Sequence, residues 1–312
     1  MRRLPMRRTA PLLPVLSLCA ACATNPVTGE RQLALISEAQ EIEMGAQGAR
    51  DVEQSIGLVD DAALQSYVHA IGTAMATQSE RPNLPWTFRV VDDPTPNAFA
   101  FPGGYIFVTR GLLSLMQSEA ELAGVIGHEI GHVTARHSVT LLSRSQLAQL
   151  GLGIGSILVP QVAQLGQLAG AGLQLLFLSY GRNAERQADD LGFRYALQQN
   201  YDVREMVDVF AALQRSSEVA GQSPLPTWLA SHPYPEERIE RIQQTLATLS
   251  RDLSATNSNV NAYMNRIEGL VYGDNPRAGY FENSLFLHPD LRFRLQFPQG
   301  WQTQNLAQSV SG

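Results

Sequence analysis

The spacing of apolar and polar residues changes several times along the chain, and each change predicts an element of secondary structure. Ser37 and Gln40 form a capping box at the start of a helical pattern, and residues 60–75 repeat apolar positions at helical spacing. Residues 86–91 alternate as a strand does, and residues 97–109 are typical of a β-hairpin around Pro-Gly-Gly. We therefore expect an α+β fold that is mainly helical and contains a small β-sheet.

The next helical pattern carries a His-Glu-Ile-Gly-His motif. Ser118 and Glu121 form a second capping box, so this helix is expected to begin at about Glu119. At 3.6 residues per turn, His128 and His132 stand one turn apart on the same face of the helix. Two ligands of one metal ion need this arrangement, and the motif therefore predicts a zinc site.

The glutamate of the motif and a third metal ligand elsewhere in the chain complete the predicted site. Glu129 is rotated by about 100° from His128, so it can reach a water molecule at the metal but is poorly placed as a ligand. Catalytic zinc usually has three protein ligands, and position 138, where one class of zinc peptidases has a third histidine, is Ser138. Glu185 and Asp189 lie four positions apart on a second predicted helix, so one could bind zinc while the other orients a ligand histidine. A solvated charged helix face would show the same spacing.

The second half of the chain is less regular. Residues 147–178 are apolar but are interrupted by Gln and Pro, so no stretch suits a membrane span of about 20 residues. They are interpreted either as a buried helical hairpin, or as a lid over the cleft or a surface that touches membrane or client protein. A helix is expected over residues 236–249, and strand-like aromatic segments follow from residue 265. Residues 251–312 are therefore expected to be a β-rich extension that is cut short.

The N-terminal segment resembles a bacterial lipoprotein signal. Residues 1–21 contain four Arg, a short apolar stretch and small residues, and Cys22 follows as the expected lipidation site. A plain signal peptide cleaved nearby is the alternative. Both cysteines of the chain lie at this junction, which argues against a disulfide scaffold in the mature domain. Residues 22–36 are expected to be a tether and residues 37–250 the zinc-binding domain.

Four motifs occur in an order that is specific to one family. Residues 96–113, 127–138, 182–192 and 231–239 together resemble the CAAX-prenyl-protease-type zinc metallopeptidases. Among these, the chain is most similar to a bacterial periplasmic lipoprotein branch involved in outer-membrane quality control. The resemblance covers roughly residues 25–250 and implies a gluzincin-like metallopeptidase domain, with the active-site helix carrying the histidine motif and one Zn²⁺ per chain.

The resemblance also implies roles for individual residues. It implies that His128, His132 and Glu185 are the zinc ligands and that Glu129 is the general base. It also implies that the Asp189 carboxylate supports a ligand from behind. It implies that His232 either stabilises the transition state or reversibly blocks the open zinc position, and Arg238 is a further candidate for transition-state stabilisation. It matches the substrate-binding edge strand to Asn97, Ala98, Phe99 and Ala100.

These expectations define an enzyme and one alternative. The enzyme is a zinc-dependent endopeptidase that hydrolyses misfolded or unassembled envelope proteins in the periplasm of a Gram-negative bacterium, held at the outer membrane by a lipid on Cys22. The alternative is a periplasmic chaperone-like protein that binds unfolded outer-membrane proteins through residues 147–178, with gated proteolysis. The formal charge of −6 argues against nucleic acid as a partner, and the sequence does not indicate an oligomeric state.

Overall fold

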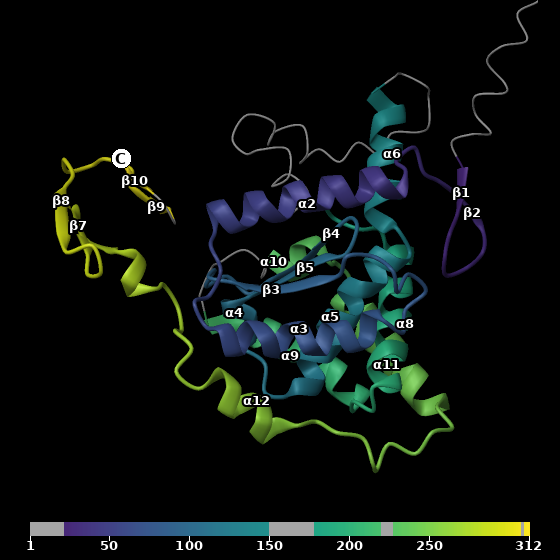
Figure 1. The fold of residues 1–312 in the computed structure, drawn as a ribbon. Coiled ribbons are helices and arrows are strands. Elements are labelled where there is room, and N and C mark those ends of the chain that lie inside the picture. The colour runs from purple at the N-terminus through teal and green to yellow at the C-terminus, as the bar shows by residue number, and fades with distance from the viewer. Residues whose placement is uncertain (1–21, 150–177, 220–226, 307–308) are drawn as a thin grey trace, which may run out of the picture.

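The computed structural model describes residues 22–149, 178–219, 227–306 and 309–312 (Figure 1). The first half contains, in chain order, β1 (Cys22–Thr24), β2 (Arg31–Leu33), α2 (Glu38–Ser55), α3 (Ala62–Ala76), β3 (Thr87–Val91), β4 (Ala98–Phe101), β5 (Tyr105–Thr109), α4 (Arg110–Leu113), α5 (Glu119–Thr134) and α6 (His137–Gln149). The second half contains α8 (Arg182–Gln198), η2 (Val203–Glu205), α9 (Met206–Val219), α10 (Thr227–Ser231), α11 (Pro235–Thr248), α12 (Val260–Ile267), η3 (Pro276–Ala278), β6 (Tyr280–Glu282), β7 (Leu285–His288), β8 (Phe293–Gln296), β9 (Gln304–Leu306) and β10 (Ser309–Ser311). Within these described ranges, no helix combines the length and the apolar character that crossing a membrane requires.

A three-stranded mixed sheet lies at the centre of the main body. Its middle strand β5 runs parallel to β3 and antiparallel to β4, which places β4 at an edge. The β4–β5 hairpin turns at Gly103 and Gly104, whose φ angles of 81° and 102° lie in a region that only glycine adopts at little cost.

Helices cover both faces of this sheet. Phe88 and Ile106 point to one face and pack in a core shared with α3 and α5, whereas Phe101 and Phe107 point to the other and pack under α2. Figure 1 shows α2 on one side of the strands and α3 with α5 on the other. Burial on both faces explains why the strands are almost continuously apolar.

Helix α5 lies in the middle of the protein and packs against α8 with little side chain between them. Gly127 and Gly131 of α5 face Gly192 and Ala188 of α8, so a Cβ on either glycine of α5 would come within about 3.0 Å of the α8 backbone. Small residues allow the two backbones to approach this closely. The functional side chains of α5 and α8 are thereby brought into one volume.

A buried ion-pair network connects α2 to the C-terminal end of α5. Glu41 accepts hydrogen bonds from Arg81 Nη1 at 2.6 Å and from Arg136 Nε at 3.0 Å, and all three side chains are buried. Arg81 also donates to the carbonyl of Val133 in the last turn of α5. Paired and hydrogen-bonded in this way, the buried charges hold that end of α5 in place.

The segment expected to be a tether, residues 22–36, includes the β1–β2 hairpin. Asn25 donates to the carbonyl of Ala135 after α5, and the backbone N–H of Leu35 donates to Ser143 Oγ on α6. The Asn25 side chain also accepts two backbone N–H groups within the turn, which a sequence pattern of turn residues could not distinguish from a free linker.

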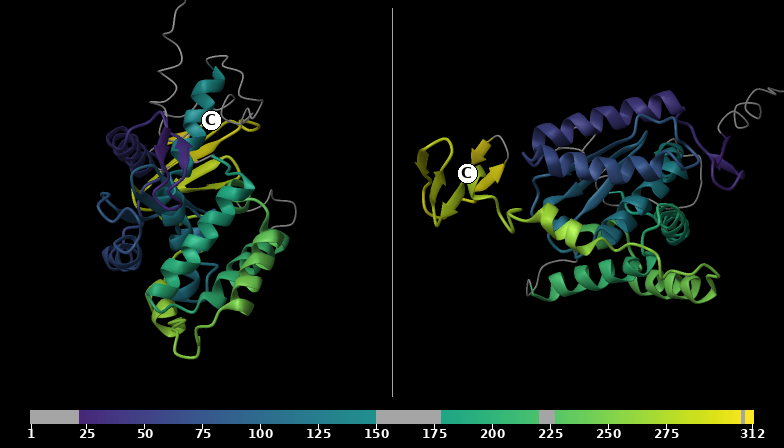
Figure 2. Two further views of the ribbon diagram at one scale, coloured as in Figure 1. Left: turned by 90° about the vertical axis from the view of Figure 1, so that its right-hand side faces the viewer. Right: turned by 60° about the horizontal axis from the view of Figure 1, so that its bottom comes forward.

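The C-terminal region begins with a helix rather than with strands. Tyr263 of α12 is buried and donates to the carbonyl of Leu113, and Arg110 donates to the carbonyls of Val271 and Gly273. Beyond these contacts, the antiparallel β6–β7–β8 sheet and the β9–β10 pair lie to one side of the main body (Figure 1 and the right view of Figure 2).

The predicted fold class, mainly helical α+β with a small sheet, is confirmed. The predicted signal, residues 1–21, lies outside the described residues, as does most of the apolar segment 147–178. The limits set for the tether, the zinc-binding domain and the C-terminal extension stay predictions.

We predict that Gly192→Ala destabilises the protein. The new Cβ would lie 2.7 Å from the backbone nitrogen of His128, and overpacking at a site this tight typically costs about 1–3 kcal/mol. The measurement is the free energy of unfolding in urea, with Gln198→Ala on the exposed side of the same helix as the matched control. If the helices were not in close contact, Gly192→Ala would instead stabilise α8 by about 1 kcal/mol through helix propensity.

Candidate metal centre

Two histidines on α5 form the centre of a buried polar cluster. His128 and His132 are almost completely buried, and their Nε2 atoms lie 3.0 Å apart. Burial holds the pKa of both rings well below the usual range, and the Arg238 guanidinium lowers that of His128 further. Neutral imidazole rings present lone pairs, so the two nitrogens are suited to share a cation.

Glu185 of α8 contributes the third group. Its Oε2 lies 3.5 Å from His128 Nε2, and its Oε1 lies 3.6 Å from His132 Nε2. Among the described residues, Oε2 is buried and accepts no hydrogen bond, although Arg238 Nη1 forms an ion pair with it at 3.1 Å. One ligand atom from each of His128, His132, Glu185 and His232 lies within 4.8 Å of the others, so the four side chains could hold a metal ion.

The spacing of these atoms fits a tetrahedral metal ion. Ligands bound at about 2.0–2.1 Å around tetrahedral zinc are separated by roughly 3.3–3.4 Å. The distances from His128 Nε2 to His132, His232 and Glu185 are 3.0, 3.2 and 3.5 Å, on both sides of that value. Two imidazole nitrogens and a carboxylate oxygen are also the donor types that zinc takes in catalytic sites.

Asp189 lies one turn after Glu185 on α8 and orients the first histidine. Its Oδ1 is 2.8 Å from His128 Nδ1, so the ring donates to Asp189 from Nδ1 and keeps the Nε2 lone pair for the cluster. Arg238 of α11 binds the same carboxylate with both Nε and Nη2, at 2.8 and 2.7 Å. On α8, therefore, the Glu185 carboxylate faces the cluster and the Asp189 carboxylate lies behind His128.

The Arg238 guanidinium is buried and is committed to neighbouring protein groups. It packs against the rings of both Phe210 and Trp228, 4.8 and 5.1 Å from their centroids. Its Nη1 donates to the carbonyl of His232 and lies 3.1 Å from Glu185 Oε2. With Asp189 occupying the remaining donors, this geometry favours a positioning role for Arg238 over direct contact with a substrate.

His232 follows α10 and reaches the same cluster. Its Nδ1 lies 3.2 Å from both His128 Nε2 and Glu185 Oε1, and its Nε2 lies 3.4 Å from Glu129 Oε1. Burial lowers the pKa of His232, but the two carboxylates outweigh this effect and raise it above the usual value. The structure thus places His232 at the fourth corner of the cluster.

Glu129 points to the side of the cluster and has a partner that the sequence did not indicate. Its carboxylate is buried, which raises its pKa, and Trp228 Nε1 donates to Oε1 at 3.3 Å. Trp228 is on the short helix α10, and its ring also packs near those of His128 and His232. A lone Trp in a proline-rich stretch has no spacing that could have identified it.

The remaining predicted residues contribute no ligand atom to the cluster of His128, His132, Glu185 and His232. Asn97 precedes β4, and Ala98, Phe99 and Ala100 belong to it, so all four are at the edge of the central sheet. Asn97 Oδ1 is buried without a hydrogen-bond partner among the described residues. Cys22 begins β1.

The geometry agrees with what comparison with known proteins shows. A model of peptidase family M48 matches residues 62–246. The chain belongs to this family. The motif resemblance and the expectation of a metallopeptidase are thereby confirmed, whereas the identity of the metal stays a prediction.

Several curated relatives are similar over the same region. The beta-barrel assembly-enhancing protease of Yersinia pestis is 28% identical over 269 residues, 83% of this chain and 53% of the relative. The protein of the same name from Escherichia coli is 29% identical over 226 residues, which are 69% of this chain and 46% of the relative. A mitochondrial metalloendopeptidase, OMA1 of Schizosaccharomyces pombe, is 29% identical over 194 residues, which are 60% of this chain and 55% of the relative. The chain spans about half the length of these relatives.

We predict that Trp228→Phe slows peptide hydrolysis about tenfold at unchanged KM and unchanged metal content. The ring is largely kept, but the N–H donor to Glu129 is lost, and one such hydrogen bond is worth about 1–1.5 kcal/mol. The measurement is kcat on a fluorogenic peptide together with metal content. Trp86→Phe, which removes an indole donor to the Arg81 carbonyl elsewhere, is the matched control. An equal loss of kcat in both variants, or no loss of kcat in Trp228→Phe, would contradict a role of Trp228 in supporting Glu129.

Proposed function

We propose that this protein is a zinc-dependent endopeptidase that hydrolyses peptide bonds of misfolded or unassembled envelope proteins. The observation that carries the proposal is the convergence of His128, His132 and Glu185 at separations of 3.0–3.6 Å, with Glu129 alongside them. Membership of a peptidase family supports the reaction class. His128, His132 and Glu185 would hold the ion, which supplies Lewis acidity toward the scissile carbonyl when bound.

The protein's own groups account for proton transfer. Glu129 acts as the general base toward the attacking water and passes the proton to the leaving amine. Its burial and raised pKa suit a carboxylate that must first accept a proton and then release it. Asp189 orients His128 through a hydrogen bond, and Arg238 holds Asp189 and Glu185 in position.

The substrate and the location are proposed on other grounds. The names of the bacterial relatives concern assembly of β-barrels, which supports envelope proteins as clients. The edge strand β4, with Asn97, Ala98, Phe99 and Ala100, is the proposed place where an extended substrate adds to the sheet. The signal-like N-terminus supports a periplasmic protein held at the outer membrane through Cys22.

His232 is proposed to block the metal at rest. Catalytic zinc sites keep one position open, and His232 Nδ1 lies where a fourth ligand would be. Arg238 donates to the carbonyl of His232, so the residue that contacts Asp189 and Glu185 also holds His232 in this position. Activity would then require α10 and the residues after it to shift.

Glu129→Gln is expected to retain zinc and to lose hydrolysis by at least about a hundredfold, because a general base contributes roughly 10²–10⁴ in rate. His128→Ala is expected to lose both zinc and activity. Zinc content measured beside digestion of casein separates the two effects, and Glu43→Gln on the exposed side of α2 is the control. Full activity of Glu129→Gln would refute the mechanism.

His232→Ala is expected to raise the rate of hydrolysis of a small fluorogenic peptide several-fold at unchanged zinc content, because the fourth position becomes free. The comparison is made at saturating zinc over a range of peptide concentrations. A fall in kcat with zinc retained would instead assign His232 to transition-state stabilisation.

A further inference from the structure

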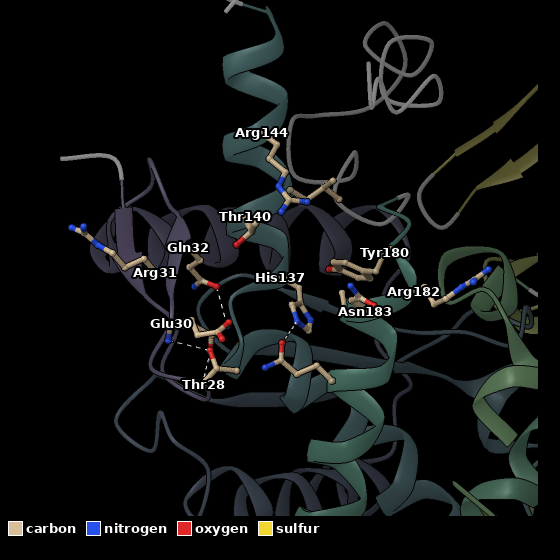
Figure 3. A pocket seen from close by; sticks show the side chains of 15 residues that line it. Thr28, Glu30, Arg31, Gln32, His137, Thr140, Arg144, Tyr180, Arg182 and Asn183 are labelled. Carbon is tan, nitrogen blue, oxygen red and sulfur yellow. Dashed lines mark hydrogen bonds between the residues drawn. The ribbon is translucent and has the colours of Figure 1, made fainter. Parts of the chain in front are cut away.

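A polar pocket lies beside the metal centre, and none of the roles described above uses it. Its volume is about 540 Å³, and its walls come from the β1–β2 hairpin, from α6 and from the start of α8 (Figure 3). Three segments far apart in the sequence therefore build one cavity.

Two side chains connect this pocket to the metal centre. Tyr180 lines the pocket, and its ring stacks on that of His132 at 4.0 Å between centroids. His137 also lines it, donates or accepts through Nδ1 at 3.0 Å from His132 Nδ1, and is held by Gln187 on α8. The pocket is thus one layer of side chains away from a proposed metal ligand.

The pocket contains polar groups without partners. Gln32 Nε2 and Thr140 Oγ1 are both buried, and neither has a hydrogen-bond partner among the described residues. Leaving such groups unpaired costs free energy, and both can donate to an acceptor placed between the hairpin and α6. This arrangement is typical of a site that a ligand completes.

The charge of the pocket selects the kind of acceptor. Three of its side chains are Arg31, Arg144 and Arg182, against the single carboxylate of Glu30. Arg182 pairs with Glu237 at 3.1 Å, but Arg31 and Arg144 form no ion pair within the part of the chain that the structure describes. Two guanidinium groups without an ion pair, on a protein with net charge −6, indicate an anionic ligand, and guanidinium binds carboxylate and phosphate groups with two hydrogen bonds.

We infer that this pocket is a substrate subsite that binds a carboxylate of the polypeptide being cleaved, either an Asp or Glu side chain near the scissile bond or a free C-terminus. The inference rests on the proposed peptidase function. A peptide is favoured over a membrane lipid because the wall formed by His137 and Tyr180 is shared with His132. Arg144 would pair with the carboxylate, and Gln32 and Thr140 would donate to it. Arg31, whose side chain extends away from the cavity in Figure 3, would pair with it after turning inward.

The test uses fluorogenic peptides that differ only by Glu or Gln at each position flanking the cleaved bond, and the same peptides with a free or an amidated C-terminus. The wild-type protein is expected to favour the carboxylate form about tenfold in kcat/KM at one position. In Arg31→Gln, Arg144→Gln and the double variant, this ratio is expected to fall toward one. Arg89→Gln, on the exposed side of β3, is the control and is expected to keep it. A preference for Glu over Gln at an internal position shows that the pocket binds an acidic side chain. A preference for the free over the amidated C-terminus shows that it binds the terminal carboxylate.

Binding to the Glu129→Gln protein, measured by fluorescence anisotropy with the same peptides, separates this inference from the proposed function. Tighter binding of the carboxylate peptides that depends on Arg31 and Arg144 supports the subsite even if no peptide is cleaved. Cleavage and binding without any such preference overturn the subsite and leave the peptidase intact. If the arginine variants instead lose only binding to phosphatidylglycerol vesicles, the pocket faces lipid and the inference is wrong.

Discussion

The site depends first on the close contact between α5 and α8. Gly127 and Gly131 on one helix face Gly192 and Ala188 on the other, and the backbones meet with almost no side chain between them. Two helices at this distance can place a carboxylate from one within reach of imidazole rings from the other. With larger residues at the contact, the ligand set would be split between two surfaces of the protein.

A second constraint is the burial of charge around that contact. Arg238 packs against two aromatic rings and contacts Asp189, Glu185 and the carbonyl of His232. A buried guanidinium is stable only when its donors are paired, so the same pairing that makes the arginine tolerable also fixes the metal-facing groups. Removing either partner would leave a buried charge without compensation, which is why positioning and stability are hard to separate here.

Helix α5 is also held at its C-terminal end. Glu41, Arg81 and Arg136 tie α2 to the last turn of α5, and Asn25 attaches the N-terminal hairpin just beyond it. The hairpin thus forms a wall next to the metal centre, where a free tether would leave the start of α8 open. A segment whose sequence suggested only a connection to a membrane anchor therefore packs against the protein and lines a pocket beside His132.

The sequence by itself determined the local features. The capping boxes at Ser37 and Ser118, the four-residue spacing of His128 and His132, and that of Glu185 and Asp189 depend only on helix geometry, which is set by neighbours along the chain. The tertiary structure decided the rest, namely that Trp228 meets Glu129, that His232 stands at the fourth corner, and that residues 22–33 form a pocket wall. These contacts join residues separated by about a hundred positions, and no periodic pattern records them because they arise only when distant helices pack together.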